Sequence, residues 1–447
     1  MSLRAALLCL FVSWVLTSWS QAEPVSFSRQ IAPILLENCQ ACHGAKRTKG
    51  GYRVDTFEEA VGEGDSGIAG FVAGDLKASE AFQRIVSDDE DERMPLDRDP
   101  LSRDQIELLT RWIQQGAKFD GVNPKAQIAT LASGATQPDP PEQYRHPIPV
   151  TALHFSHDGS ELFVGGYHEV TVWSGSEGKL VRRIRNVGQR TMGLDLSTDG
   201  RLLAVAGGAP GRSGSVRVFD ALSGELKKVT GSCGDLVLDV QYSPDSKRLA
   251  ATTIDSGIQI FDAGSGALQL SINKHADWVN AVSWSPDGTR LVTASRDKSC
   301  KVFDSSTGKL STTYGGHGNP VKGVAFLPDG LEVFSSGGDK KVHRWKIADG
   351  AKVAEIGFGN EVFKLPSVDT FLFAVSADKT VRQIEAKTNK EVRKFEGHVD
   401  WALTVDFHSG MQRLASGGHN GMIRIWDTSD GSEVVSFIAA PGYIRPK

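Results

Sequence analysis

Apolar residues recur along the rear two-thirds of the chain in units of similar length. In six of the seven units a short apolar run ends at an aromatic residue, usually followed by Asp. The remaining unit has Ile at this position. Successive members stand 46, 42, 42, 42, 39 and 42 residues apart, at Trp173, Phe219, Phe261, Phe303, Trp345, Ile384 and Trp426. This period is typical of β-propeller blades, which contain four short strands each. The pattern therefore predicts an all-β propeller of seven blades.

Each unit also opens with a similar strand and turn. The fourth unit begins with apolar residues at Val279, Val282 and Trp284, and the turn Ser285–Gly288 follows. Pro at the second position of the turn, followed by Asp-Gly, is typical of the tight turn that joins two strands of a hairpin. Together these features resemble the WD-repeat family of β-propellers over residues 146–440.

The resemblance implies that certain His and Asp residues belong to buried hydrogen-bond networks of the scaffold. The matching residues are His275, His317, His398, Asp297, Asp339 and Asp378. The family pattern is complete in the fifth unit, which adds Trp345, whereas the seventh has Asn420 where Asp is expected. Residues 433–439 can supply the outer strand of the last blade. No strand is evident just before His146, so we expect the ends of the ring to meet by packing alone.

Before residue 120 the apolar spacing is helical. The spacing of four apolar residues predicts one helix that ends at Cys39: Phe27, Ile31, Ile34 and Leu35. Pro33 should kink this helix or mark its true start. The capping box Ser102–Gln105 opens a second helix, ended near Gly116, with apolar residues on one side at Ile106, Leu109, Trp112 and Ile113. We therefore expect a small all-α front domain over residues 23–120.

Composition and charge support two domains. The chain has 447 residues, of which 48 are Gly, and a net charge of −4. Such a length predicts two or three domains. The near-neutral charge excludes a broad basic surface for binding nucleic acid. Residues 23–120 contain 12 Lys and Arg against 19 Asp and Glu, while the remainder of the chain is nearly neutral. An acidic front domain thus precedes a neutral rear domain.

The first 22 residues predict export. A positive charge at Arg4 precedes an almost wholly apolar run over residues 5–19, and Ser20–Ala22 offers small residues for cleavage. We expect a secretory signal peptide over residues 1–22 with Glu23 as the first mature residue. A membrane anchor is the alternative, but a run of about 15 falls short of the ~20 residues that span a bilayer. The mature protein should be exported and periplasmic, without a transmembrane segment.

The sequence Cys39-Gln40-Ala41-Cys42-His43 is the attachment motif of c-type haem. Two thiols one helical turn apart can add to the two haem vinyl groups, and the adjacent imidazole then ligates iron. A zinc site, a redox-active cysteine pair and a structural disulfide are the alternatives. No further Cys or His lies between Gly44 and Arg145 to complete a zinc site. We therefore expect one covalently attached haem c.

The second axial ligand of the iron follows by elimination. Haem proteins of this kind use Met or His. After Cys42, the acidic domain contains one methionine, Met94, and no further histidine after His43. Met94 follows the acidic run 88–92, where packing poorly explains a lone methionine. We expect Met94 to ligate the iron.

These motifs, in this order, resemble the planctomycete-type cytochrome c domain. The similarity covers residues 25–119 and rests on Cys39–Gly44, Gly74-Asp75, Ser87–Asp89, Glu92–Pro95 and Leu101–Ala117. It implies that His43 and Met94 are the axial ligands, and that the 62–74 loop wraps the haem edge.

A linker over residues 121–145, with four prolines, should join the two domains. The chain lacks the common nucleotide, zinc-protease and serine-hydrolase motifs, so an electron carrier is favoured over an enzyme. We expect electron transfer, with a protein redox partner that docks on the propeller or the haem edge. Haem-based sensing, or a redox enzyme with a substrate site in the propeller, are the alternatives.

Two tryptophans are candidates for partner binding. His275–Trp278 and His398–Trp401 are matching segments that place Trp278 and Trp401 in loops entering a blade, on one rim. Exposed Trp is enriched at binding hot spots. Rings packed between blades are the alternative interpretation.

Overall fold

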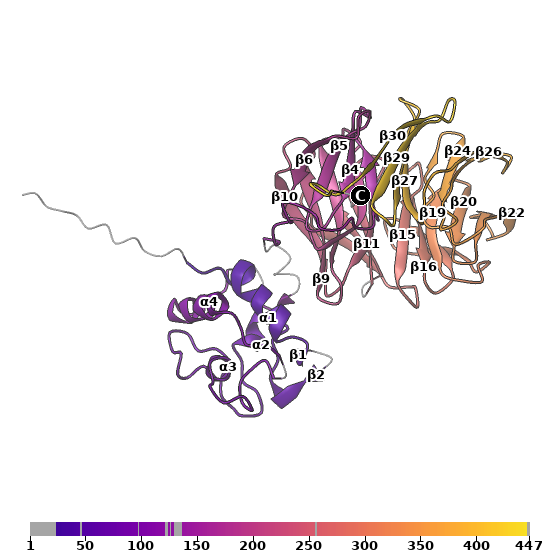
Figure 1. The fold of residues 1–447 in the computed structure, drawn as a ribbon. Coiled ribbons are helices and arrows are strands. Elements are labelled where there is room, and N and C mark those ends of the chain that lie inside the picture. Colours follow the sequence, from indigo (N-terminus) through magenta and orange to yellow (C-terminus); the bar gives the residue numbers. More distant parts are fainter. Residues whose placement is uncertain are drawn as a thin grey trace, which may run out of the picture.

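The computed structural model describes residues 24–44, 47–96, 98–120, 124–125, 127–128, 136–254 and 257–444. It shows a small helical front domain and a large ring of β-sheets (Figure 1). The expected signal peptide, 1–22, lies outside the described residues, as does part of the expected linker. No helix in the described part of the chain is both long enough and apolar enough to cross a membrane.

The front domain is mainly helical, as its apolar spacing predicts. Its elements are η1 (Phe27–Ile31), α1 (Ala32–Asn38), β1 (His43–Gly44), β2 (Arg47–Thr48), η2 (Lys49–Gly51), α2 (Phe57–Ala60), α3 (Glu80–Ile85) and α4 (Arg103–Gln114). Pro33 stands at the start of α1, and the predicted capping box forms at Ser102 and Gln105. Both helix predictions are confirmed.

Aromatic side chains hold the core of the front domain together. The Trp112 ring on α4 lies 5.5 Å from both Phe27 and Phe71, between ring centroids. Ile128 is also fully buried in this core, and its N–H donates to the Asp55 carbonyl over 2.6 Å. The front domain therefore still has a described contact at residue 128, beyond the expected domain end at residue 120.

The rear domain is a seven-bladed β-propeller, as predicted, and every blade contains four antiparallel strands. The first four blades are β3 (Leu153–Phe155), β4 (Glu161–Gly165), β5 (Val170–Ser174), β6 (Leu180–Ile184); β7 (Arg190–Leu196), β8 (Leu202–Ala209), β9 (Ser213–Asp220), β10 (Leu226–Cys233); β11 (Val237–Tyr242), β12 (Arg248–Thr253), β13 (Gly257–Asp262), β14 (Leu268–Ile272); and β15 (Val279–Trp284), β16 (Arg290–Ser295), β17 (Cys300–Asp304), β18 (Leu310–Tyr314).

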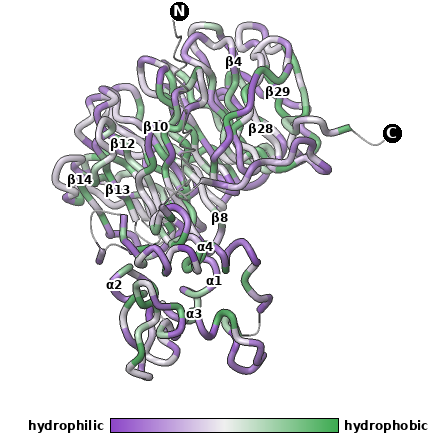
Figure 2. Tube along the Cα trace, turned by 90° about the vertical axis from the view of Figure 1, so that its left-hand side faces the viewer, coloured by the Kyte–Doolittle hydropathy of each residue, from purple (hydrophilic) through white to green (hydrophobic). Residues whose placement is uncertain are grey.

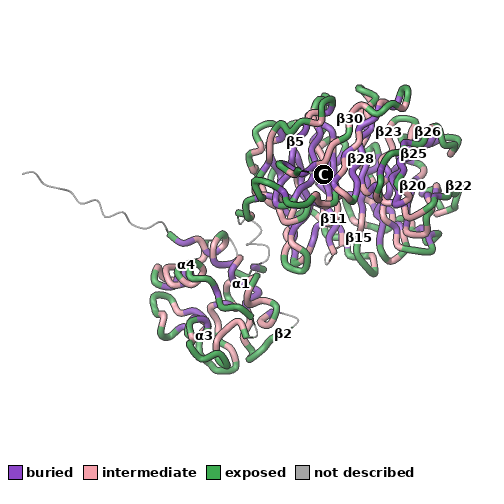
Figure 3. Tube along the Cα trace, viewed as in Figure 1, coloured by how far each residue is buried: buried purple, intermediate pink, exposed green. Residues whose placement is uncertain are grey.

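The last three blades follow in chain order. They are β19 (Val321–Phe326), β20 (Glu332–Gly337), β21 (Lys341–Lys346), β22 (Lys352–Gly357); β23 (Ser367–Val368), β24 (Phe371–Val375), β25 (Val381–Glu385), β26 (Glu391–Phe395); and β27 (Ala402–His408), β28 (Arg413–Gly418), β29 (Met422–Asp427), β30 (Glu433–Ile438). The residues that set the sequence period sit at the same register of every blade, opposite an aliphatic residue: Trp173–Leu162, Phe219–Leu203, Phe261–Leu249, Phe303–Leu291, Trp345–Val333, Ile384–Leu372 and Trp426–Leu414. Buried positions follow the strands inside the blades (Figure 3).

The ring closes without a strand exchanged from the N-terminal side. As expected, β30 supplies the outer strand of the seventh blade from the C-terminal end. The ends do not meet by packing alone, however. The segment before residue 146 hydrogen-bonds to the C-terminal segment, from the Tyr144 N–H to the Pro441 carbonyl (3.0 Å) and from Gln143 Nε2 to the Gly442 carbonyl (2.7 Å).

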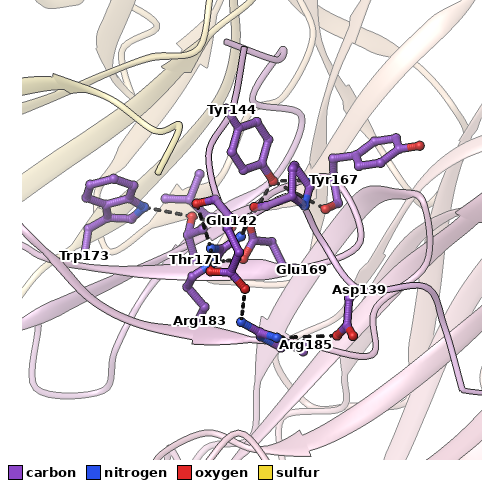
Figure 4. Close-up of polar contacts among 11 residues, drawn as sticks. Asp139, Glu142, Tyr144, Tyr167, Glu169, Thr171, Trp173, Arg183 and Arg185 are labelled. Carbon is purple, nitrogen blue, oxygen red and sulfur yellow. Dashed lines mark hydrogen bonds and ion pairs between the residues drawn. The ribbon is translucent and has the colours of Figure 1, made fainter. Parts of the chain in front are cut away.

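A buried ion pair fixes the same segment to the first blade (Figure 4). Glu169 is fully buried, and Arg183 binds it through Nε (2.6 Å) and Nη2 (2.9 Å). The Tyr144 hydroxyl donates to the same carboxylate over 2.6 Å. A buried carboxylate is costly unless it is paired, so Glu169 needs both Arg183 and the Tyr144 hydroxyl. The bond to Glu169 thereby fixes Tyr144 at the point where the ring closes.

Each blade presents its ends to two opposite faces of the propeller. We call the face where the first strand of each blade begins the near face, and the other the far face. Turns between second and third strands also lie on the near face. Figure 1 shows that this face, marked by the end of β16 and the start of β9, is turned toward the front domain.

Candidate functional site

The end of α1 presents the cysteine motif. Cys39 caps the helix with its N–H on the Leu35 carbonyl (2.9 Å), and the N–H groups of Cys42 (3.1 Å) and His43 (3.0 Å) both donate to the Cys39 carbonyl. The chain thus continues through one compact turn after the helix. Cys39 and Cys42 are not joined by a disulfide.

The four residues expected to hold haem border two adjoining cavities. The larger, about 250 Å³, is lined by Cys39, His43 and Met94. The smaller, about 50 Å³, shares these three residues and adds Cys42. Apolar side chains form much of the remaining wall of the larger cavity: Leu35, Val54, Phe71, Ala81 and Ile85. Two thiols, an imidazole and a thioether around an apolar space are a donor set that suits a c-type haem.

A hydrogen bond orients the His43 ring. Its Nδ1 lies 3.2 Å from the Tyr52 carbonyl oxygen, so Nδ1–H is the donor and Nε2 carries the free lone pair. The Tyr52 hydroxyl in turn donates to the Ala60 carbonyl over 2.6 Å. A ligating histidine usually gives its second N–H to such a partner, which fixes the tautomer and the ring orientation. The sequence offered no signal for this carbonyl.

The 62–74 loop lines the larger cavity through Gly64, Ser66, Gly70 and Phe71. A side chain at Gly70 would collide with the Tyr52 ring, because a Cβ there would lie 2.1 Å from the hydroxyl oxygen. Glycine at this position therefore allows the loop to close over the residue that orients His43.

Charged residues line part of the same cavity. Lys49, Glu80 and Arg84 contribute to its wall, and Arg84 Nη2 lies 3.0 Å from Glu80 Oε1. Ser66 also hydrogen-bonds to Glu80. Lys49 and Arg84 are the cations that could meet the carboxylates of a bound porphyrin.

The chemistry of the thiols does not favour a redox-active cysteine pair. Burial, followed by the nearby Cys42, raises the pKa of Cys39 to about 12. Reactive cysteines have lowered pKa values because the thiolate is the nucleophile. Among the described residues, a group of three or more potential metal ligands converges elsewhere, at His317, Asp339 and His343 of the fifth blade.

In the fifth blade, His317 belongs to a complete hydrogen-bond network. Its Nδ1 lies 2.8 Å from Asp339 Oδ2, and its Nε2 lies 2.8 Å from Ser335 Oγ. The Trp345 Nε1–H donates to the same Ser335 oxygen over 3.1 Å. Both ring nitrogens of His317 are therefore engaged by the scaffold.

The fourth and seventh blades contain parts of this network. His275 contacts Asp297 and Thr293, both at 2.8 Å. His398 keeps only the contact to Ser416 Oγ (2.7 Å), and its buried Nδ1 has no hydrogen-bond partner among the described residues. The sequence departure at Asn420 thus has a direct structural consequence.

The two candidate binding tryptophans occupy equivalent positions on the near face. Trp278 accepts a backbone hydrogen bond from Arg296 (2.9 Å), and Trp401 accepts one from His419 (2.8 Å). Their residues are 40% and 47% exposed. The Arg296 guanidinium carbon lies 4.7 Å from the Trp278 ring centroid. Both rings remain accessible to a partner.

The propeller also encloses a central cavity of about 560 Å³, which the sequence analysis missed. His154 Nε2 lies 3.3 Å from Asp195 and its Nδ1 lies 3.6 Å from Asp406. Burial alone would lower the pKa of His154, but the two carboxylates raise it to about 10. Lys364 Nζ lies 3.8 Å from Asp239 on the same cavity wall.

Comparison with known proteins agrees with this division of the chain. Residues 39–97 match the family model of Planctomycete cytochrome C. The model of the WD domain, G-beta repeat, matches residues 224–262, 266–304, 308–346 and 389–427. The chain joins a planctomycete-type cytochrome c segment to a WD-repeat propeller. No curated protein matches the chain.

These matches and the structure give the protein its broad character. The cytochrome c segment implies a haem protein, and a WD-repeat propeller is suited to protein–protein interaction. The match begins at Cys39 and includes Met94, so it spans the motif and the cavity-lining methionine.

Proposed function

We propose that the protein is an exported, periplasmic electron carrier with one covalently attached haem c. Cys39 and Cys42 would form the thioether bonds, His43 Nε2 would ligate the iron, and Met94 would be the second axial ligand. The observation that carries the proposal is the meeting of these four residues at two adjoining cavities. Haem bound there would supply reversible one-electron chemistry.

The surrounding residues support this role in distinct ways. The Tyr52 carbonyl holds the Nδ1 proton of His43 and so keeps Nε2 available as a ligand. Leu35, Val54 and Phe71 make part of the cavity wall apolar. Met opposite His raises the reduction potential relative to bis-His ligation. Such a site favours an electron carrier that keeps both ligands in both oxidation states.

The propeller would act as the docking platform for a protein partner. Its near face carries the exposed Trp278 and Trp401, which lie in equivalent loops of the fourth and seventh blades. Partly exposed tryptophans are frequent hot spots of protein interfaces. The redox partner would bind at this face or at the haem edge.

A redox enzyme is the second candidate, because the propeller contains a cavity of about 560 Å³ lined by ionisable residues. Reduction of the haem by an added small molecule, lost on substitution of His154, would favour this enzyme.

The experiment that tests the proposed ligands compares the wild type with Met94→Ala. The protein should be exported from a host that matures c-type cytochromes and its optical spectrum recorded in both oxidation states. We expect the weak long-wavelength band of sulfur–iron ligation in the oxidised wild type, its loss in Met94→Ala, and a lower potential in the variant. An unchanged spectrum would refute Met94 as a ligand. Ready carbon monoxide binding by the wild type would favour haem-based sensing instead.

A further inference from the structure

Three successive blades place an exposed lysine at the same position of the near face. Lys298, Lys340 and Lys379 each follow the turn Asp between the second and third strands, and each has a positive φ, of 69°, 65° and 73°. The preceding aspartates are engaged within their own blades, by His275, by His317 and by Arg382. None of the three lysines forms an ion pair within the described residues, although Lys379 lies close enough to Asp400 to help lower the pKa of that carboxyl. Their charge is therefore available to a partner.

The exposed tryptophans flank this row of lysines. Trp278 stands in the fourth blade and Trp401 in the seventh, so the two rings bracket the fourth to sixth blades that carry the lysines. We call Trp278, Lys298, Lys340, Lys379 and Trp401 the Trp–Lys arc. An arc of aromatic and basic side chains suits a partner with acidic and apolar residues.

Carboxylates near the arc already have cationic neighbours. Asp277 lies 3.7 Å from the Arg296 guanidinium, and Asp400 lies 3.2 Å from the His419 imidazole, which is a cation only when protonated. Glu361, in the intervening sixth blade, pairs with Lys322 at 2.8 Å. The unpaired lysines therefore leave the arc with an excess of positive charge.

The front domain carries the complementary surface. Five consecutive acidic residues, 88–92, are all exposed, and two exposed apolar residues, Val86 and Leu96, flank them. This acidic loop leads directly to Met94, which lines both cavities of the haem site. A partner that binds the loop would thus sit next to the candidate haem site.

The acidic loop of a given chain is turned away from its own propeller. The loop follows α3, which lies on the side of the front domain remote from the propeller in two perpendicular views (Figures 1 and 2). Within one chain, the front domain contacts the near face through α1 and not through the acidic loop. Arg212, in the turn after β8, lies 3.2 Å from Glu37 on α1. The acidic loop is therefore free to meet a second molecule.

The connection between the domains holds the front domain near blades one and two. Ile128 is buried in the front domain, and the Gln137 N–H donates to Asn186 Oδ1 (2.8 Å) between the first two blades. Nine residues span at most about 32 Å. The blades that carry the Trp–Lys arc lie farther around the ring, so the two sites do not coincide.

We propose that the Trp–Lys arc binds the acidic loop of a second copy of this chain. Opposite charges would steer the two copies together, and Trp278 and Trp401 would bury apolar surface beside Val86 and Leu96. Reciprocal binding would close a two-fold dimer. One near face would then hold two front domains, its own and that of the second copy. This inference rests on the proposed function, and it makes a second copy of this chain the protein partner that docks on the near face.

The test is zero-length carboxyl-to-amine cross-linking of an equimolar mixture of ¹⁵N-labelled and unlabelled holoprotein. We expect mixed-isotope links between the 88–92 peptide and Lys298, Lys340 or Lys379 at low salt, reduced at least tenfold at 1 M salt, where the Debye length is ~3 Å. The triple variant K298E/K340E/K379E removes the cross-linking amines themselves, so its effect is measured on the dimer: the dissociation constant from sedimentation velocity should rise at least tenfold.

The matched control is K247E/K309E/K390E, which reverses three exposed lysines in far-face turns. It should change this dissociation constant less than twofold. Charge reversal on the loop, D88K/E90K/E92K, should also abolish self-association, and mixing this variant with K298E/K340E/K379E should restore it. Misfolding of either variant could explain a loss of binding, but it could not restore binding when the two variants are mixed.

Three results would overturn the proposal: links confined to one isotope, equal effects of the two lysine triple variants on the dissociation constant, or a monomer at all protein concentrations in low salt. The haem spectrum of the same samples reports separately on the proposed function. A haem-loaded monomer would refute the docking alone, whereas a haem-free dimer would refute the electron-carrier proposal alone.

Discussion

The hydrogen-bond network of the fifth blade allows a sharp test of how WD-type networks stabilise this propeller. Ser335 is fully buried, and its hydroxyl contacts both His317 Nε2 (2.8 Å) and Trp345 Nε1 (3.1 Å). Since Nδ1–H of His317 donates to Asp339, Nε2 accepts from the Ser335 hydroxyl while the indole N–H donates to it. Ser335→Ala would therefore leave one buried donor and one buried acceptor without partners.

The magnitude follows from the number of groups left unpaired. Each unsatisfied buried polar group costs about 1–3 kcal/mol, so Ser335→Ala should lower the free energy of unfolding by about 2–6 kcal/mol. Ser416 in the seventh blade is the internal control, because it is equally buried and contacts His398. One orphaned group there gives an expected loss of about 1–3 kcal/mol.

The assay is urea denaturation of the full-length protein, followed by tryptophan fluorescence and by circular dichroism. The midpoint should fall for both variants and fall further for Ser335→Ala, with similar slopes. Equal midpoint shifts, or a larger shift for Ser416→Ala, would show that the two-partner role assigned to Ser335 is wrong.

Four further predictions concern other parts of the molecule. Asn420→Asp should supply the missing acceptor for His398 and stabilise the propeller by about 0.5–1.5 kcal/mol in urea titrations. Burial, then a nearby arginine, lowers the pKa of His398 to about 4, so wild-type stability should fall as pH drops from about 6.5 to about 4, and less so in Asn420→Asp. Tyr144→Phe should lower the thermal midpoint, since its buried carboxylate partner loses a donor, and an unchanged midpoint would argue against its role in ring closure. Cys39→Ala with Cys42→Ala should give haem-free protein with an unaltered strand signal in circular dichroism; loss of that signal would contradict independent folding of the propeller.

The sequence predicts the parts of the fold that depend on local periodicity. The aromatic period reflects a repeated register against the second strand of each blade, as at Trp345 and Val333, so spacing alone reveals seven blades. The capping box at Ser102 is likewise a local signal. Ring closure is different, because the bond from Tyr144 to the Pro441 carbonyl joins residues almost 300 positions apart.

For the candidate site, the cysteine motif and the search for a second axial ligand identify the haem-binding residues. They do not identify the groups that orient those residues. Met94 stands beside the same cavity as Cys39, although iron ligation by either His43 or Met94 stays a prediction. The Tyr52 carbonyl that orients His43 is a backbone group without a residue-type signal. The central pair of His154 with Asp406 exists only because the ring brings the first and last blades together.

Covalent attachment of haem to Cys39 and Cys42 can be tested by intact-mass and peptide mass spectrometry of protein secreted by a host that matures c-type cytochromes. We expect a chain that begins at Glu23 and carries the added mass of one haem, located on the peptide that contains Cys39 and Cys42. Secreted protein of unmodified mass, without colour, from a host shown to mature another c-type cytochrome would contradict this expectation.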